Sequence, residues 1–110
     1  MVDDDLAVLQ SLKFLLETVG YSVAAYRSAA EFLKDEAARP ACLIVDQHMP
    51  AMTGLELVAR LREMEAAVPA LLITGSPSPA IAARAFQLGV AMLEKPPLED
   101  DVLSFIDAHA

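Results

Sequence analysis

One stretch, residues 41–45, constrains the fold of this chain more than any other. Five apolar residues in succession are typical of a strand covered on both faces, as in a parallel sheet between two helix layers. The run stops at Asp46, and Pro50, which cannot continue a strand, follows shortly. Ligands of open α/β sheets bind at the carboxyl ends of the strands, so Asp46 occupies a functional position. Taken alone, such an Asp is more often a turn or helix-capping residue.

Composition limits the possible classes of protein. A chain of 110 residues is expected to form one domain, residues 1–110. Sixteen acidic and eight basic residues give a net charge of −8, which argues against direct binding to nucleic acid. No apolar run approaches the ~20 residues of a membrane span, and no signal peptide opens the chain. The single Cys42, inside the central apolar strand, cannot form an internal disulfide, and we expect a cytoplasmic protein.

Hydrophobic periodicity predicts alternating strands and helices. Helices are predicted at residues 6–19, 28–38, 55–66, 80–88 and 99–108, and strands at 21–26, 41–45, 70–73 and 90–93, after a first strand reduced to residues 1–2. Asp5, Ser28 and Ser78 are expected to cap helices. The buried stripe of the first helix is expected to include Val19, and that of the third to include Met64. Such alternation predicts a parallel sheet with helices on both faces.

Polar residues follow four of these strands, all at one edge of the predicted sheet. They are Asp3 and Asp4, Asp46, Thr74 and Lys95. Close carboxylates repel each other by roughly 4 kcal/mol per pair at 4 Å, so a divalent cation or a lysine must compensate them. Mg²⁺ prefers a few carboxylate oxygens plus waters, and an Asp beside it can act as a nucleophile toward a phosphoryl group. The lysine and the threonine hydroxyl would then bind the phosphoryl oxygens.

Four motifs, spread over nearly the whole chain, carry a resemblance to a known family. They are Val2-Asp3-Asp4-Asp5, Val45-Asp46-Gln47-His48-Met49-Pro50 with Thr53-Gly54-Leu55-Glu56, Ile73-Thr74-Gly75, and Glu94-Lys95-Pro96. As a set they are highly specific. The chain resembles a response-regulator receiver domain of two-component signalling, closest in pattern to receivers of the FixJ type.

This resemblance implies a role for each polar residue. Asp46 would be the phosphoacceptor, taking a phosphoryl group from a histidine kinase or a phosphotransfer protein. Mg²⁺ would be held by Asp3, Asp4, Asp46 and the backbone carbonyl of His48. Thr74 would be the switch hydroxyl, and Lys95 the charge partner of the phosphate.

The resemblance also implies a fold and an interface. The fold would be a flavodoxin-like, doubly wound, five-stranded parallel sheet of order 2-1-3-4-5 with five helices, and the Lys95–Pro96 bond would be cis. A homodimer, if formed, would use the fourth helix and the fifth strand. No contact with membrane or nucleic acid is expected of this domain, and any binding to DNA would belong to an output domain.

Three departures from the family pattern stand out. Only Met1 and Val2 precede the acidic pair, and losing about four buried aliphatic residues would remove roughly 6–12 kcal/mol. We expect a clipped chain, a misassigned start or a borrowed strand. The position of the family's aromatic switch residue holds Met92, which could equally be ordinary packing. The sequence ends at Ala110 without an output domain, as in a stand-alone receiver or a fragment.

Two other classes of function are weaker interpretations. An aspartyl-phosphate hydrolase of the haloacid-dehalogenase kind requires a second Asp two residues after the nucleophile, where this chain has His48. We therefore do not predict an enzyme. A degenerate receiver, acting as a protein-interaction module without phosphorylation, would fit if the short first strand disabled the site.

Overall fold

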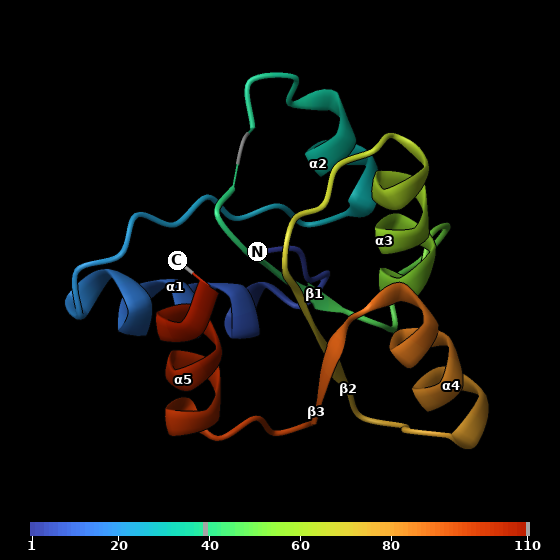
Figure 1. The fold of residues 1–110 in the computed structure, drawn as a ribbon. Coiled ribbons are helices and arrows are strands. Elements are labelled where there is room, and N and C mark those ends of the chain that lie inside the picture. Colours follow the sequence, from blue (N-terminus) through green and yellow to red (C-terminus); the bar gives the residue numbers. More distant parts are fainter. Residues whose placement is uncertain (39, 110) are drawn as a thin grey trace.

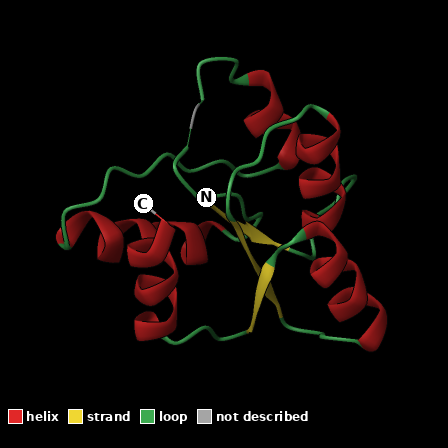
Figure 2. Ribbon diagram, in the orientation of Figure 1, coloured by secondary structure: helices red, strands yellow, loops and turns green. Residues whose placement is uncertain are grey.

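The computed structural model describes residues 1–38 and 40–109, which form an α/β fold (Figures 1 and 2). In chain order its elements are α1 (Leu6–Thr18), α2 (Ala29–Lys34), β1 (Leu43–Asp46), α3 (Gly54–Glu63), β2 (Ala70–Thr74), α4 (Pro79–Leu88), β3 (Ala91–Glu94) and α5 (Glu99–His109). The predicted fold class and five helices are confirmed. None of the helices in this described part has the length and hydrophobicity needed to span a bilayer.

The sheet has three strands in the described residues, where the sequence predicted five. β1, β2 and β3 lie side by side in that order, and both pairs are parallel. The register places Asp46 opposite Ile73 and Thr74 opposite Glu94, so the carboxyl ends of all three strands meet at one edge. This half of the predicted topology is confirmed.

The prediction of regular first and second strands is wrong. Residues 1–2 and 21–26 form only isolated β-bridges among the described residues. Val2 bridges Tyr26 on one side and Val45 on the other, both in parallel orientation. The Val2 N–H donates to the Ile44 carbonyl at 2.8 Å, and the Asp46 N–H donates to the Val2 carbonyl at 2.9 Å. These bridges follow the predicted order 2-1-3. Among the described residues, Val2 makes the bridges on this side of β1, and residues 21–26 form no ladder beyond Tyr26.

Helices cover both faces of the sheet (Figure 1). One core cluster joins the sheet to α2, α3 and α4 through buried residues that include Phe32, Leu57 and Ala85. The second joins the opposite face to α1 and α5 through Leu16, Val102 and Ile106. The layered arrangement therefore matches a doubly wound fold.

Capping residues fix where several helices begin. Asp5 accepts hydrogen bonds from the N–H groups of Ala7 and Val8, and Ser78 accepts one from Ile81 with Pro79 at the first helical position. Ser28 caps α2 in the same way. These caps are all confirmed.

Some details of the prediction are wrong. Helix α2 ends at Lys34 instead of continuing to residue 38, since residues 35–38 form a turn and an irregular connection. Val19 and Met64, expected in buried stripes, are 50% and 63% exposed because each lies just past the end of its helix. Cys42 precedes β1 and is half-buried against the second core cluster.

Candidate functional site

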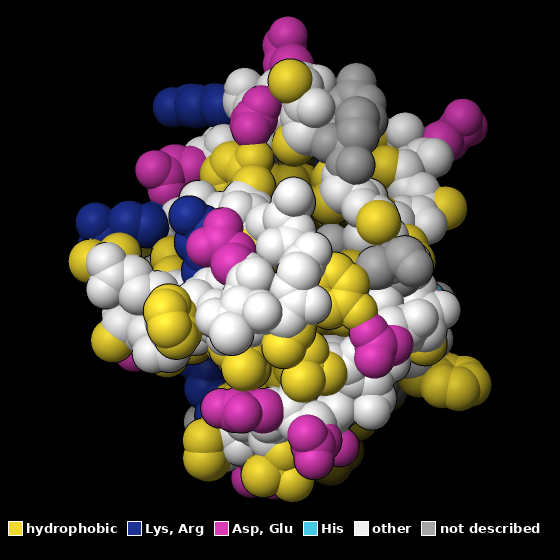
Figure 3. Space-filling model, turned by 90° about the vertical axis from the view of Figure 1, so that its left-hand side faces the viewer, with side chains coloured by type: hydrophobic (Ala, Val, Ile, Leu, Met, Phe, Trp, Pro, Cys, Tyr) yellow, Lys and Arg dark blue, Asp and Glu magenta, His cyan; other side chains and the backbone are white. Residues whose placement is uncertain are grey.

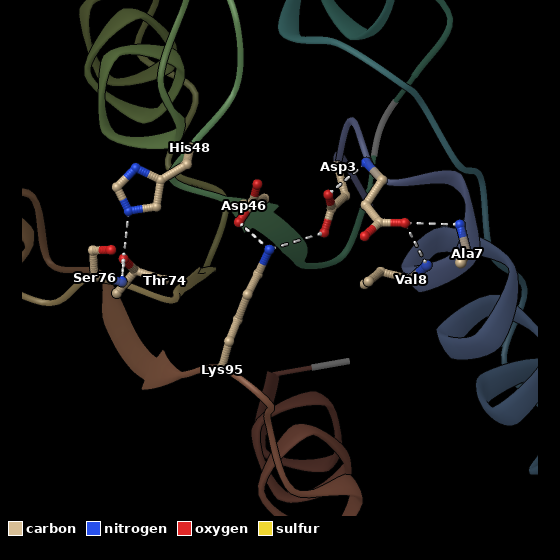
Figure 4. Close-up of polar contacts among 9 residues, drawn as sticks. Asp3, Ala7, Val8, Asp46, His48, Thr74, Ser76 and Lys95 are labelled. Carbon is tan, nitrogen blue, oxygen red and sulfur yellow. Dashed lines mark hydrogen bonds and ion pairs between the residues drawn. The ribbon is translucent and has the colours of Figure 1, made fainter.

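The predicted site residues gather at the carboxyl edge of the sheet (Figure 4). Asp46 is the last residue of β1 and Thr74 the last of β2, while Lys95 directly follows β3. Asp3 and Asp4 follow the Val2 bridge. One carboxylate oxygen from each of Asp3, Asp4 and Asp46 lies within 4.8 Å of the others, as the sequence predicted from the shared strand edge.

Lys95 is the cation of this cluster. Its Nζ lies 2.8 Å from Asp46 Oδ1 and 3.9 Å from Asp3 Oδ2. Burial alone would lower the pKa of Lys95, but the contact with Asp46 and the charge of Asp3 outweigh it and raise the pKa above its ordinary value. Lys95 therefore stays charged, and among the described residues its ammonium is the one polar partner of the buried Asp46 Oδ1.

Asp3 is buried beside Asp46, whereas Asp4 is exposed. Desolvation raises the pKa of Asp3 above its ordinary value; the hydrogen bond from the Asp5 N–H, at 2.9 Å, opposes this, and the charge of Asp46 adds to it. Three carboxylates facing one ammonium leave the cluster with an excess of negative charge. Such a cluster can hold a divalent cation bound by oxygen ligands.

Thr74 is fully buried, and its hydroxyl contacts groups other than the carboxylates. Its Oγ1 accepts a hydrogen bond from the Ser76 N–H at 3.1 Å and lies 2.9 Å from Nε2 of the exposed His48 side chain. The sequence predicted the place of Thr74 at the site. It assigned a role only to the backbone carbonyl of His48 and missed the imidazole, because the contact with Thr74 joins side chains far apart in the sequence.

The loop after β1 is held by two residues that sequence reasoning did not assign. Gln47 is buried, and its side-chain oxygen accepts a hydrogen bond from the Leu55 N–H at 2.9 Å. The Gly54 N–H donates to the Gln47 carbonyl at 3.2 Å. A Cβ on Gly54 would lie 2.6 Å from the Asp46 carbonyl oxygen and 2.7 Å from Leu72 Cδ1. Glycine is therefore required here, because the start of α3 packs directly on the backbone of Asp46.

β3 brings two further predicted features to the edge. The Lys95–Pro96 bond is cis, as predicted, and the Lys95 N–H donates to the Thr74 carbonyl at 2.9 Å. Met92 lies opposite Leu72 in the ladder and is half-buried against the core. Its position is compatible with packing and with the switch role that the resemblance implies.

Fold and sequence together define the class of protein. Residues 1–107 match the family described as "Response regulator receiver domain", and the chain belongs to this family. Receiver domains are phosphoacceptors of two-component signalling and generally bind Mg²⁺ at an acidic pocket.

Individual relatives agree with this assignment. The chain is 36% identical to the response regulator protein TodT of Pseudomonas putida over 110 residues, covering 98% of this chain and 48% of TodT. It is 41% identical to the transcriptional regulatory protein FixJ of Azorhizobium caulinodans over 100 residues, covering 87% of this chain and 46% of FixJ. The predicted FixJ-type resemblance is confirmed.

A solved structure supports the fold. A CheY-like response regulator receiver domain protein from Methanospirillum hungatei superposes with a TM-score of 0.90 at 30% identity, over 97% of this chain and 87% of that one. The chain spans about half the length of the curated relatives that it matches.

Proposed function

We propose that this domain accepts a phosphoryl group on Asp46 from the phosphohistidine of a kinase or a phosphotransfer protein. The observation that carries the proposal is the pairing of the buried Asp46 carboxylate with Lys95 Nζ at 2.8 Å, beside Asp3 and Asp4. A carboxylate oxygen of Asp46 attacks phosphorus, and the P–N bond breaks as the O–P bond forms. The imidazole nitrogen leaves with the electron pair and takes up a proton.

Lys95 acts on the product. Its ammonium is already placed against Asp46 and reaches Asp3 at 3.9 Å, so it can pair with the phosphoryl oxygens once they are attached. Lys95 remains charged throughout, because its pKa is raised. The Thr74 hydroxyl is the donor expected to reach the phosphoryl group from β2.

The acidic cluster fits Mg²⁺. Three carboxylates have oxygens within 4.8 Å of one another and can supply part of an octahedral oxygen shell, with waters and a phosphoryl oxygen completing it. Asp3, Asp4, Asp46 and the backbone carbonyl of His48 would hold it. When bound, the ion would neutralise charge on the phosphoryl oxygens and so reduce repulsion between the donor and the carboxylates.

The signal would leave through β2, α4 and β3. Movement of Thr74 toward a phosphoryl group would displace residues 75–79, which lead into α4, and change the space next to Met92. The contact face of a homodimer or a partner would then be formed by α4 and β3, where Phe86 is 87% exposed. Because Met92 lacks a ring, Met92→Tyr should alter that contact more than it alters phosphorylation.

A phosphorylation experiment tests the proposal. Incubation with a small phosphodonor and Mg²⁺ should add one phosphoryl group to the wild type and none to Asp46→Asn, because an amide is not a nucleophile. Asp5→Asn is the matched control, since it makes the same chemical change nearby and Asn also caps helices well. Label retained by Asp46→Asn would refute the assignment. A wild type that takes no label would favour the degenerate receiver instead.

A further inference from the structure

The imidazole of His48 has no role in the mechanism so far. His48 lies on the loop after β1, and its Nε2 is 2.9 Å from Thr74 Oγ1 (Figure 4). The dashed lines of Figure 4 join the Thr74 hydroxyl to His48 and Ser76, and none joins it to Asp46. The proposed function requires this same hydroxyl to bind the phosphoryl group on Asp46.

The hydrogen-bonding capacity of Thr74 fixes the direction of the contact. A hydroxyl carries one proton and two lone pairs, and the Ser76 N–H already occupies one lone pair at 3.1 Å. Thr74 is fully buried, so its proton needs an acceptor. Among the described residues, His48 Nε2 is the one other hydrogen-bond partner of Oγ1, and it can accept this proton when Nε2 carries none. The Thr74 O–H therefore donates to Nε2, and the ring proton of the neutral imidazole lies on Nδ1.

We propose that His48 is a positioning residue that holds the Thr74 hydroxyl in its unphosphorylated orientation. The inference rests on the proposed function. One proton cannot serve two acceptors fully, so a phosphoryl oxygen must take the Thr74 proton away from His48. The imidazole thus opposes the switch and sets how strongly phosphorylation is coupled to the movement of Thr74.

Removing this competition should tighten binding of a phosphoryl mimic. With Mg²⁺ and beryllofluoride as the probe, His48→Ala should lower the Kd for beryllofluoride about 2- to 10-fold, the range expected for one hydrogen bond. The substitution leaves the backbone carbonyl in place. His48→Gln, whose side chain can still accept a hydrogen bond, should restore part of the wild-type affinity.

Two controls separate this role from a general effect on structure. His109→Ala removes the other histidine of the chain, which contacts Phe105 on α5, and should leave the Kd unchanged. In a Thr74→Val background the hydroxyl is absent, so His48→Ala should have no effect on the Kd. A spectroscopic signature completes the test: the ¹⁵N resonance of His48 Nε2 should shift when beryllofluoride binds, and the His109 resonances should not.

The outcomes distinguish this inference from the function on which it rests. A wild type that does not bind beryllofluoride with Mg²⁺ refutes both. A wild type that binds, together with a His48→Ala variant of unchanged or weaker affinity, refutes the role of His48 and leaves the phosphoacceptor intact. An equal effect of His48→Ala in the Thr74→Val background also refutes it.

Discussion

The two sides of β1 are built differently. Toward β2 and β3, continuous parallel ladders place Thr74 and Lys95 at the site. On the other side, Val2 is the one residue of the described part of the chain that bridges β1, and the acidic pair that follows it depends on a few backbone hydrogen bonds. The candidate site is therefore assembled from one firmly placed half and one weakly supported half.

Open pockets lie on both faces of the sheet. One of about 540 Å³ lies beside Met1, between residues 21–26 and the residues leading into β1, and apolar side chains such as Leu16, Ile44 and Ile106 line it. Another of about 870 Å³ lies between α2 and α3, so the two sides differ in strand pairing and not in the presence of a pocket. Hydrophobic atoms also reach the surface on the side that carries α1 and α5 (Figure 3). A single bridged residue, Val2, therefore brings Asp3 and Asp4 close to Asp46 without a regular strand among the described residues.

A matched pair of valines compares the two sides of β1, and the larger effect is expected at Val45. Val2 and Val45 are bridge partners, both fully buried in the same core cluster. Truncation to Ala removes two methyl groups, or about 1.6 kcal/mol from transfer alone. Val45→Ala should lower the free energy of unfolding by more than this transfer term, because the neighbouring ladders prevent collapse and the remaining cavity costs about 24 cal/mol per Å³. Val2→Ala should cost no more than the transfer term, because its surroundings can relax.

Urea denaturation of the two variants checks this prediction. Equal losses in the free energy of unfolding would show that both sides of β1 are equally rigid and would contradict the difference between them. Amide hydrogen exchange is a second measurement, because the amides of Val2 and Asp3 should exchange faster than those of β2.

Gly54→Ala tests the firmly placed half directly. The new Cβ would meet the Asp46 carbonyl oxygen at 2.6 Å, so the backbone of either residue must shift. We expect a loss of about 1–3 kcal/mol in the free energy of unfolding, as for other overpacked sites. Gly75→Ala is the matched control, because the nearest contact of its Cβ is the Lys95 side chain at 3.8 Å. Equal stability of the two variants would contradict the close approach.

Asp3→Asn should produce a smaller effect of opposite sign. The folded-state pKa of Asp3 is raised, so the folded protein binds the proton more tightly than the unfolded chain does. The stability that follows is present below the unfolded pKa and is lost as pH rises through the folded pKa. At neutral pH without Mg²⁺, Asp3→Asn should therefore be more stable than the wild type, and should lose less stability between acidic and neutral pH.

Mg²⁺ should reverse that order, because an ion that binds only the folded state stabilises it, and Asp3→Asn offers one carboxylate fewer. Thermal melts with and without Mg²⁺ measure both effects. If Mg²⁺ raised the melting temperature of Asp3→Asn as much as that of the wild type, Asp3 would not be a ligand of the ion.

Much of the fold follows from local sequence signals. The Ser78-Pro79 start and Gly89 end of α4 depend on neighbouring residues, and so does the apolar run that became β2. The strand predicted at residues 21–26 is absent for a reason that local signals do not contain. A strand needs a paired neighbour, and Val2 supplies a single bridge, to Tyr26. The rule that parallel strands end at one edge of the sheet was enough to predict that Asp3, Asp4, Asp46 and Lys95 lie close together. The contact between His48 and Thr74 joins side chains 26 residues apart, and no local pattern specifies it.

The most direct measurement of the central claim locates the modified residue chemically. After incubation with a phosphodonor and Mg²⁺, borohydride converts an aspartyl phosphate to homoserine, which peptide mass spectrometry can place in the chain. We predict homoserine at position 46 alone, and none when Mg²⁺ is chelated. Homoserine at position 3 or 4, or at no position while Mg²⁺ is bound, would contradict the assignment of Asp46 as the phosphoacceptor.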